Sequence, residues 1–268
     1  MMISSPFPKN LGHGCTAAVR VFLALLLLGV TGLLSPSAKA VTYTWSTAPT
    51  SSNFNTATDW TNNAVPVTGN PWAFTNSTIT GLNNDLTTSA FSVTGITFNS
   101  NANAFTISGN AFTLNGAIAN NSKNVQTIND AIILGASETI TPTVGGGNII
   151  LNGAITGATF GLTIAAAESP ISGVPNVISA GSVVLGGSNT FTGNITNNGS
   201  LVLANGYALG NGTSSNVSTV QMATAGAILT FASDTALVNS NLTISNSVAG
   251  GSWWNIVLDR GSVGAGMT

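Results

Sequence analysis

The chain has very few charged residues and almost none of the side chains that metal sites and nucleophilic enzymes use. Its 268 residues include five Lys or Arg, seven Asp or Glu, one His and one Cys, and charged residues make up 4% of the total. An ordinary globular protein has roughly 25%. The single Cys15 excludes an intrachain disulfide and a cysteine-rich zinc site.

Residues 1–40 have the three parts of a secretory signal peptide and are excluded from the fold prediction. They contain the basic residues Lys9 and Arg20, then a 14-residue apolar run, and they end in the cleavage motif Ala-Lys-Ala. The alternative, a transmembrane anchor, needs roughly 20 apolar residues. We expect cleavage near Ala40, secretion or cell-surface display, and no membrane span in the mature chain.

Cleavage at that site removes three of the five basic residues together with His13 and Cys15. Only Lys123 and Arg260 remain against seven carboxylates, which gives a net charge of −5. So few cations do not neutralise phosphate groups, which excludes nucleic acid and anionic lipid as partners. We therefore expect no metal site and no cofactor.

The remaining composition predicts an all-β fold. Helix-forming Glu, Lys, Arg and Gln are nearly absent, whereas β-branched residues dominate the apolar positions and Asn, Thr, Ser and Gly supply the turns. Residues 92–98 alternate between apolar and polar with a break at Gly95, and residues 103–109 (NAFTISG) and 110–116 (NAFTLNG) are near-copies. Such copies suit successive faces of a coil. The prediction is a right-handed parallel β-helix over residues 78–268, with coils of roughly 20–25 residues.

A second internal repeat indicates a longer period. The segment 114–118 (LNGAI) recurs at 151–155, which is 37 residues further on. Spacing of this size predicts a degenerate repeat with loop insertions.

Residues 41–77 are the least regular part of the mature chain and contain Trp45, Trp60 and Trp72. A solenoid end exposes unpaired strand edges and open core, and bulky aromatic residues cover such an end. We therefore predict an N-terminal cap here. The alternative hypothesis is that these three tryptophans stack on sugar rings and form a glycan-binding site.

The clearest repeat unit spans residues 188–210, where Asn and Gly turns separate short alternating strands. It contains Asn-Thr-Phe-Thr-Gly at 189–193, Gly-Ser-Leu-Val-Leu at 199–203 and Ala-Leu-Gly at 208–210. These three elements resemble the consensus of the autotransporter-associated β-strand repeat of bacterial secreted proteins. The segment between Gly193 and Gly199 is one residue shorter than the usual form.

The resemblance implies an extracellular, elongated, non-catalytic β-helical passenger. Members of that family are usually longer and end in a barrel or a sorting signal, whereas this sequence ends at Thr268. We therefore expect the chain to be truncated at its C-terminus.

Few residues are candidates for catalysis. A lyase needs a base with further cations, but Lys123 and Arg260 are 137 positions apart. A glycosidase needs two carboxylates about 5–9.5 Å apart. No catalytic, metal or cofactor residue is predicted. The seven carboxylates are Asp59, Asp85, Asp130, Glu138, Glu168, Asp234 and Asp259.

The leading hypothesis is a secreted or cell-surface β-helical protein with a structural or adhesive role and no enzymatic activity. Its partners would be polysaccharides or other surface molecules, or further copies of itself. The first alternative is a polysaccharide-active β-helix enzyme, either a lyase or a glycosidase. The second is a subunit of a self-assembling surface layer or fibre, joined through the open C-terminal coil.

Overall fold

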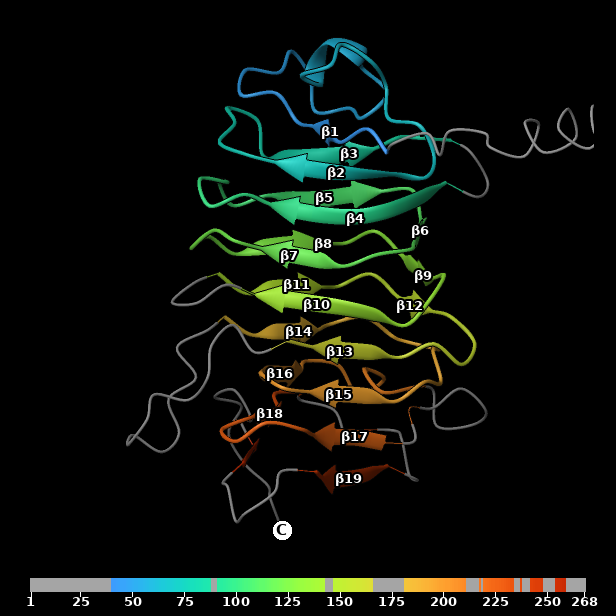
Figure 1. Ribbon diagram of the computed structural model, residues 1–268, viewed down its shortest axis with the longest axis vertical. Coiled ribbons are helices and arrows are strands. Elements are labelled where there is room, and N and C mark those ends of the chain that lie inside the picture. The colour runs from blue at the N-terminus through green and yellow to red at the C-terminus, as the bar shows by residue number, and fades with distance from the viewer. Residues whose placement is uncertain are drawn as a thin grey trace, which may run out of the picture. The chain divides into compact units, whose positions relative to one another are not determined.

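The fold is a right-handed parallel β-helix, as predicted, and almost all of its regular structure is strand (Figure 1). Residues 40–268 form one compact unit. Residues 1–39, which the sequence analysis expects to be a signal peptide, lie outside the described residues. The computed structural model describes residues 40–87, 91–142, 147–165, 181–210, 217, 219–233, 237, 242–247 and 254–258.

Each coil contributes one strand to each of two long parallel sheets, which we call face 1 and face 2. Figure 1 shows the face 1 strands in front and most of the face 2 strands behind them, running in the opposite direction. Face 1 contains β1 (Tyr43–Thr44), β2 (Asn70–Phe74), β4 (Ser92–Phe98), β7 (Ile118–Asn120), β10 (Glu138–Pro142), β13 (Leu162–Ile164), β15 (Ile195–Asn197), β17 (Thr219–Met222) and β19 (Thr243–Asn246). Face 2 contains β3 (Gly81–Asn84), β5 (Thr106–Gly109), β8 (Gln126–Ile128), β11 (Ile149–Leu151), β14 (Val183–Leu185), β16 (Ser200–Leu203), β18 (Ile228–Phe231) and β20 (Asn255–Leu258).

A third, shorter face joins the two long ones in the middle coils. It consists of β6 (Phe112–Leu114), β9 (Ile132–Leu134) and β12 (Ile155–Thr156), together with the first half of β4. The second half of β4 pairs with β7 on face 1. The bend between the halves is at Gly95, whose φ of 153° is rarely adopted by residues with a side chain. The break that the sequence shows at Gly95 is therefore the corner between two faces.

The coil length agrees with the expected 20–25 residues in the first coils and departs from it later, where the paired residues Leu151 and Leu185 are 34 positions apart and Leu185 and Leu203 are 18 apart. Paired positions on face 1 advance from Trp72 to Ile96 and then to Ile118, and those on face 2 from Ile107 to Ile128. These steps are 24, 22 and 21 residues. The near-copies NAFTISG and NAFTLNG form β5 and β6, which lie on successive faces as predicted.

The 37-residue repeat proved not to be a structural period. The first LNGAI segment runs from the end of β6 into β7, which is the corner between face 3 and face 1. The second runs from the end of β11 into β12, which is the corner between face 2 and face 3. The same five residues therefore form two different corners. Both corners need an apolar residue, an Asn-Gly turn and another apolar residue, which explains why the motif recurs out of phase with the coil.

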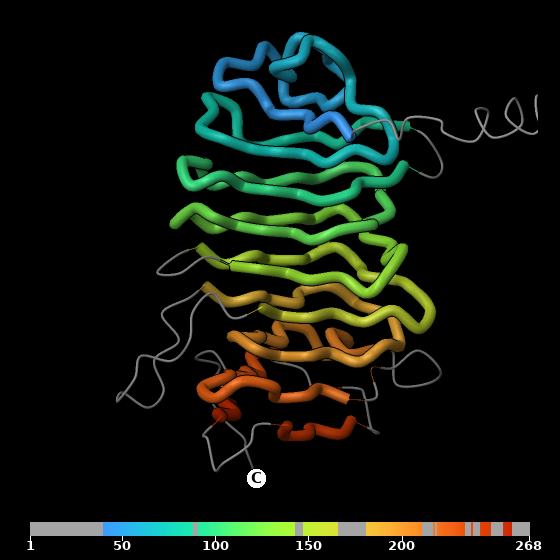
Figure 2. Tube along the Cα trace, viewed as in Figure 1, coloured from blue at the N-terminus to red at the C-terminus, as the bar shows by residue number. Residues whose placement is uncertain are grey.

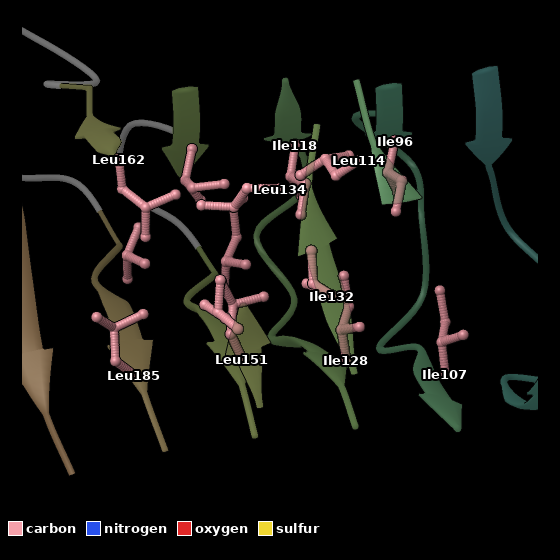
Figure 3. Packing of buried hydrophobic residues seen from close by; sticks show 14 of the residues in the cluster. Ile96, Ile107, Leu114, Ile118, Ile128, Ile132, Leu134, Leu151, Leu162 and Leu185 are labelled. Carbon is pink, nitrogen blue, oxygen red and sulfur yellow. The ribbon is translucent and has the colours of Figure 1, made fainter. Parts of the chain in front are cut away.

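The core is a set of apolar columns that run along the stack. Inward side chains of each coil lie directly over those of the next because the strands pair in register. Figure 3 shows this packing for residues of all three faces, and Figure 2 shows the coils stacked along one direction. On face 2, the column that continues Ile107 and Ile128 contains Leu151, Leu185 and Leu203, each at most 1% exposed.

The region assigned to the cap contains both irregular chain and the first strands. Residues 45–69 contain a single 3-10 helix, η1 (Ala57–Asp59), and an antiparallel bridge between Trp45 and Trp60. β2 already pairs with β4 in the parallel stack. Regular coiling therefore begins at Asn70, inside the segment 41–77.

Candidate functional site

The three tryptophans proposed as a glycan site are buried. Trp45, Trp60 and Trp72 are each 0% exposed. They pack around Phe54, with ring centroids 5.6, 5.1 and 5.0 Å from it. Stacking on a sugar needs an open ring face, and these faces are covered by other aromatic rings. In the folded chain these residues belong to the end of the core, and the sugar-platform hypothesis does not hold for them.

A buried carboxylate fixes the loop over these aromatic residues. Asp59 accepts hydrogen bonds from the backbone N–H and hydroxyl of both Thr50 and Ser51, at 2.6 to 3.0 Å. Burial by itself raises the pKa of Asp59, but the hydrogen bonds from Ser51 and Thr50 outweigh it and hold the pKa below its ordinary value of 3.8. All four of these hydrogen bonds come from its own loop, which indicates a structural role.

Asp130 is the least compensated charged group among the described residues. It lies at the corner after β8 and is 1% exposed. Its Oδ2 accepts a hydrogen bond of 3.0 Å from the amide of Asn84, whereas its Oδ1 is buried without a partner. Burial raises the pKa of Asp130 to about 6, although the Asn84 amide lowers it. Sequence reasoning missed this pair because its members are 46 residues apart.

The pair forms because the coil between its members has no side chain at that position. Gly109 pairs with Asn84 on one side and occupies the column of Asp130 on the other. A Cβ on Gly109 would lie 2.3 Å from the carbonyl oxygen of Asn84. On the next coil, a Cβ on Gly153 would lie 1.8 Å from the carbonyl oxygen of Asp130. Glycine therefore lets the polar side chains approach each other across two coils.

The other carboxylates do not form an open catalytic pair in the described part of the chain. Glu138, the first residue of β10, is 6% exposed, and burial raises its pKa. Asp85 accepts a hydrogen bond from the backbone of Asn55 in the N-terminal loop. With Asp59, Asp130 and Glu138 all buried, the described chain offers no exposed pair of carboxylates of the kind that a glycosidase needs. Glu168, Asp234, Asp259 and Arg260 lie outside the described residues.

No three potential metal-ligating side chains come together within the described residues. The buried polar residues are bonded internally instead. At the corner between face 1 and face 2, Oδ1 of Asn120 accepts from Ser122 and its Nδ2 donates to Gly147. Oε1 of Gln126 accepts from the backbone N–H of Phe105, one coil earlier. At this corner the core is therefore filled by hydrogen-bonded polar side chains in place of apolar ones.

The repeat unit at 188–210 is held by its first asparagine. Asn189 is 0% exposed, and its Nδ2 donates to the carbonyl of Ala208 at 2.8 Å. Its Oδ1 accepts from the backbone N–H of Ile155 at 2.8 Å. One side chain therefore connects the coil before it with the Ala-Leu-Gly element after it. The residue lies in the motif that the sequence analysis singled out, but its partners were not predicted.

The exterior of face 2 is a regular surface made of in-register columns. Its central outward column, which we call the β-branched column, contains only β-branched side chains. Paired registers place one such residue on each of seven successive strands. The column contains Thr106, Thr127, Ile150, Val184, Val202, Thr230 and Val257.

A second outward column on face 2 is polar in one half and small in the other. Asn152 donates to Asn129 at 3.0 Å, and Asn129 donates to Ser108 at 3.0 Å. The later coils have Gly186, Ala204 and Ala232 at the same position, which follow the paired residues Leu185, Leu203 and Phe231. We call this the amide column. None of the described outward residues of face 2 is charged.

The fold and this surface define the chain as a parallel β-solenoid with an uncharged exterior face. Among the described residues, no helix has the length and apolar character needed to cross a membrane. Comparisons with family models, with curated proteins and with solved structures found no match.

Proposed function

We propose that the mature chain is a secreted or cell-surface β-helical passenger with a structural or adhesive role and no catalytic activity. The observation that carries the proposal is the exterior of face 2, an uncharged surface that extends over seven strands. A protein with a regular outer surface and inward carboxylates is suited to contact along its length. It is poorly suited to acid–base chemistry, because Asp59, Asp130 and Glu138 are buried.

The proposed location and family rest on the sequence. The N-terminal 40 residues have the pattern of a cleaved signal, and residues 188–210 resemble the autotransporter-associated β-strand repeat. The hydrogen bond from Asn189 to Ala208 supports this resemblance, since it joins the Asn-Thr-Phe element of the motif to its Ala-Leu-Gly element. Expression of the full chain in a bacterial host should yield an exported protein that begins at Val41, as measured by intact mass.

The ligand class is expected to be neutral. Face 2 has no described charged residue to pair with a uronate or a sulfate, whereas its amide column offers donors and acceptors suited to sugar hydroxyls. The experiment is a glycan array with purified residues 41–268, with far-UV circular dichroism to verify the fold. Saturable binding to one neutral sugar class would support an adhesin. No binding from a folded sample would reject the adhesive role and leave the structural one.

Two variants localise any binding. The double variant Asn129→Ala/Asn152→Ala removes the amide row from face 2 and should abolish binding. Trp60→Phe alters a buried ring and should leave binding unchanged if the protein remains folded. Measurable turnover of any bound polysaccharide would overturn the proposal that the chain is non-catalytic.

A further inference from the structure

We propose that two copies of this chain pair face to face through face 2, with their solenoid axes antiparallel and Val184 opposite Val184 at the two-fold axis. This inference goes beyond the proposed function: the pairing covers the amide column, so it is an alternative to sugar binding at that surface and agrees with a structural role. It can be measured without a ligand or a cell. It rests on a symmetry of face 2: each outward column is complementary to the same column with the order of the coils reversed.

The order of residues in the β-branched column is nearly symmetric about Val184. A two-fold axis along the strand direction at this level reverses the order of the coils and leaves each column opposite itself. Ile150 then faces Val202, and Thr127 faces Thr230. Flat columns of in-register β-branched side chains interdigitate as dry interfaces between sheets about 10 Å apart.

The two flanking columns match in the same orientation. In the amide column, Asn152 would face Ala204 and Asn129 would face Ala232, so that each large amide meets a small side chain. In the column on the other side, Val125 would face Ile228, an apolar pair. Of these, Val125 is 41% exposed and therefore open to a partner.

The parallel arrangement of the two copies matches less well. A two-fold axis along the solenoid would place the amide column opposite the column of Val125. The amide of Asn129 would then lie against the isopropyl group of Val125, so that two large side chains would meet. The antiparallel orientation places the small Ala232 opposite Asn129 instead.

Electrostatics and area indicate a weak, closed dimer. The chain from Val41 onward has a net charge of −5, but no described outward residue of face 2 contributes to it, so the two surfaces do not repel. Seven coils about 4.8 Å apart and three columns about 7 Å apart bury on the order of 1,000 Å² in total, which is near the lower limit for a specific interface. Because a two-fold interface uses the same surface on both partners, association stops at two.

The first test is sedimentation equilibrium of residues 41–268 over the micromolar range. The expected result is a reversible monomer–dimer equilibrium. Val184→Lys should raise the dissociation constant by about tenfold or more, because it places two cations opposite each other. The matched control is Ile133→Lys, since Ile133 is an outward β-branched residue on face 3 that is 44% exposed. It should leave the equilibrium unchanged. Far-UV circular dichroism checks that each variant is folded.

The second test determines the orientation. Ile150→Glu and Val202→Lys should each weaken the dimer when introduced alone. Combined in one chain, they should restore it, because every Glu then faces a Lys of the other copy. In a parallel pair, Glu would face Glu and the double variant would be weaker than either single variant.

Several results would overturn the proposal. These are a monomer at every concentration, growth beyond two copies, equal weakening by Ile133→Lys, or no rescue by the double variant. Loss of polysaccharide binding in Val184→Lys, with an unchanged monomeric mass, would also overturn it and would assign face 2 to a glycan instead.

Discussion

The side chain of Asn189 donates a hydrogen bond of 2.8 Å to the carbonyl of Ala208, 19 residues later. The same side chain accepts from the backbone N–H of Ile155, 34 residues earlier. A fully buried side chain therefore hydrogen-bonds one backbone group that precedes it in the chain and one that follows it. Solenoid corners leave such backbone groups unpaired, because the strand ladder ends there. The buried position of Asn189 is thus explained by the backbone groups that it bonds.

Replacing this asparagine should be costly. Asn189→Ala leaves the N–H of Ile155 and the carbonyl of Ala208 buried without partners. We expect a loss of about 2 to 4 kcal/mol in the free energy of unfolding, measured by urea denaturation. Asn129→Ala, in the exposed amide column, should cost no more than about 0.5 kcal/mol. Equal effects of the two substitutions would contradict this explanation.

Asp130 should make stability fall as the pH rises from acidic to neutral. Its pKa in the folded chain is about 6, above the ordinary value of 3.8, so the folded state binds its proton more tightly than the unfolded state. The resulting stabilisation is complete below about pH 4 and is lost as the pH passes through 6. Asp130→Asn should therefore gain up to about 3 kcal/mol relative to the wild type at pH 8 and little at pH 4. Urea unfolding at both pH values measures this difference, and a constant offset between the two proteins would refute it.

Asp59 should have the opposite pH dependence at the N-terminal end. Hydrogen bonds from Thr50 and Ser51 hold its pKa below 3.8, so its contribution is present above that value and is lost as the pH falls below it. Asp59→Ala should destabilise the loop at neutral pH by about 2 to 4 kcal/mol, because four donors lose their acceptor. Tryptophan fluorescence is the readout, since Trp45 and Trp60 lie beneath this loop. Fluorescence of the wild type that stays constant below pH 3 would argue against the assignment.

Glycines of the coil should tolerate substitution according to the space at each position. A Cβ on Gly153 would lie 1.8 Å from the carbonyl oxygen of Asp130, whereas a Cβ on Gly81 meets nothing within 4 Å. Gly153→Ala should therefore lower stability by about 1 to 3 kcal/mol. Gly81→Ala should have little effect, because neither its space nor its φ opposes a side chain. Thermal unfolding of the two variants tests this contrast. Equal loss of stability in both variants would contradict it.

Much of the fold could be predicted because a stacked coil repeats one local rule. Alternation of apolar and polar residues determines which side chains point inward, and Gly or Asn marks where a strand ends. The strand expected at 199–203 is β16, and the break at Gly95 is a corner. The signal segment, the secreted location and the resemblance to the bacterial repeat family remain predictions, since they concern properties that the fold does not define.

The contacts between coils could not be predicted in the same way. Whether Asn84 meets Asp130 depends on the summed lengths of two coils, and no local pattern encodes that sum. The tryptophans illustrate the same limit, because the sequence allowed both a cap and an open sugar platform, and only packing around Phe54 buried all three. The repeated LNGAI segment was misread as a period for this reason: identical residues form different corners once the chain is coiled.

The sequence by itself therefore determined the class of fold, the length of the first coils and the near absence of charge, because these depend on composition and short-range alternation. The tertiary structure alone decided which residues share a column, which carboxylates are buried and which side chains line the exterior of face 2. Those properties arise from register, and register is set by how residues distant in the chain stack in space.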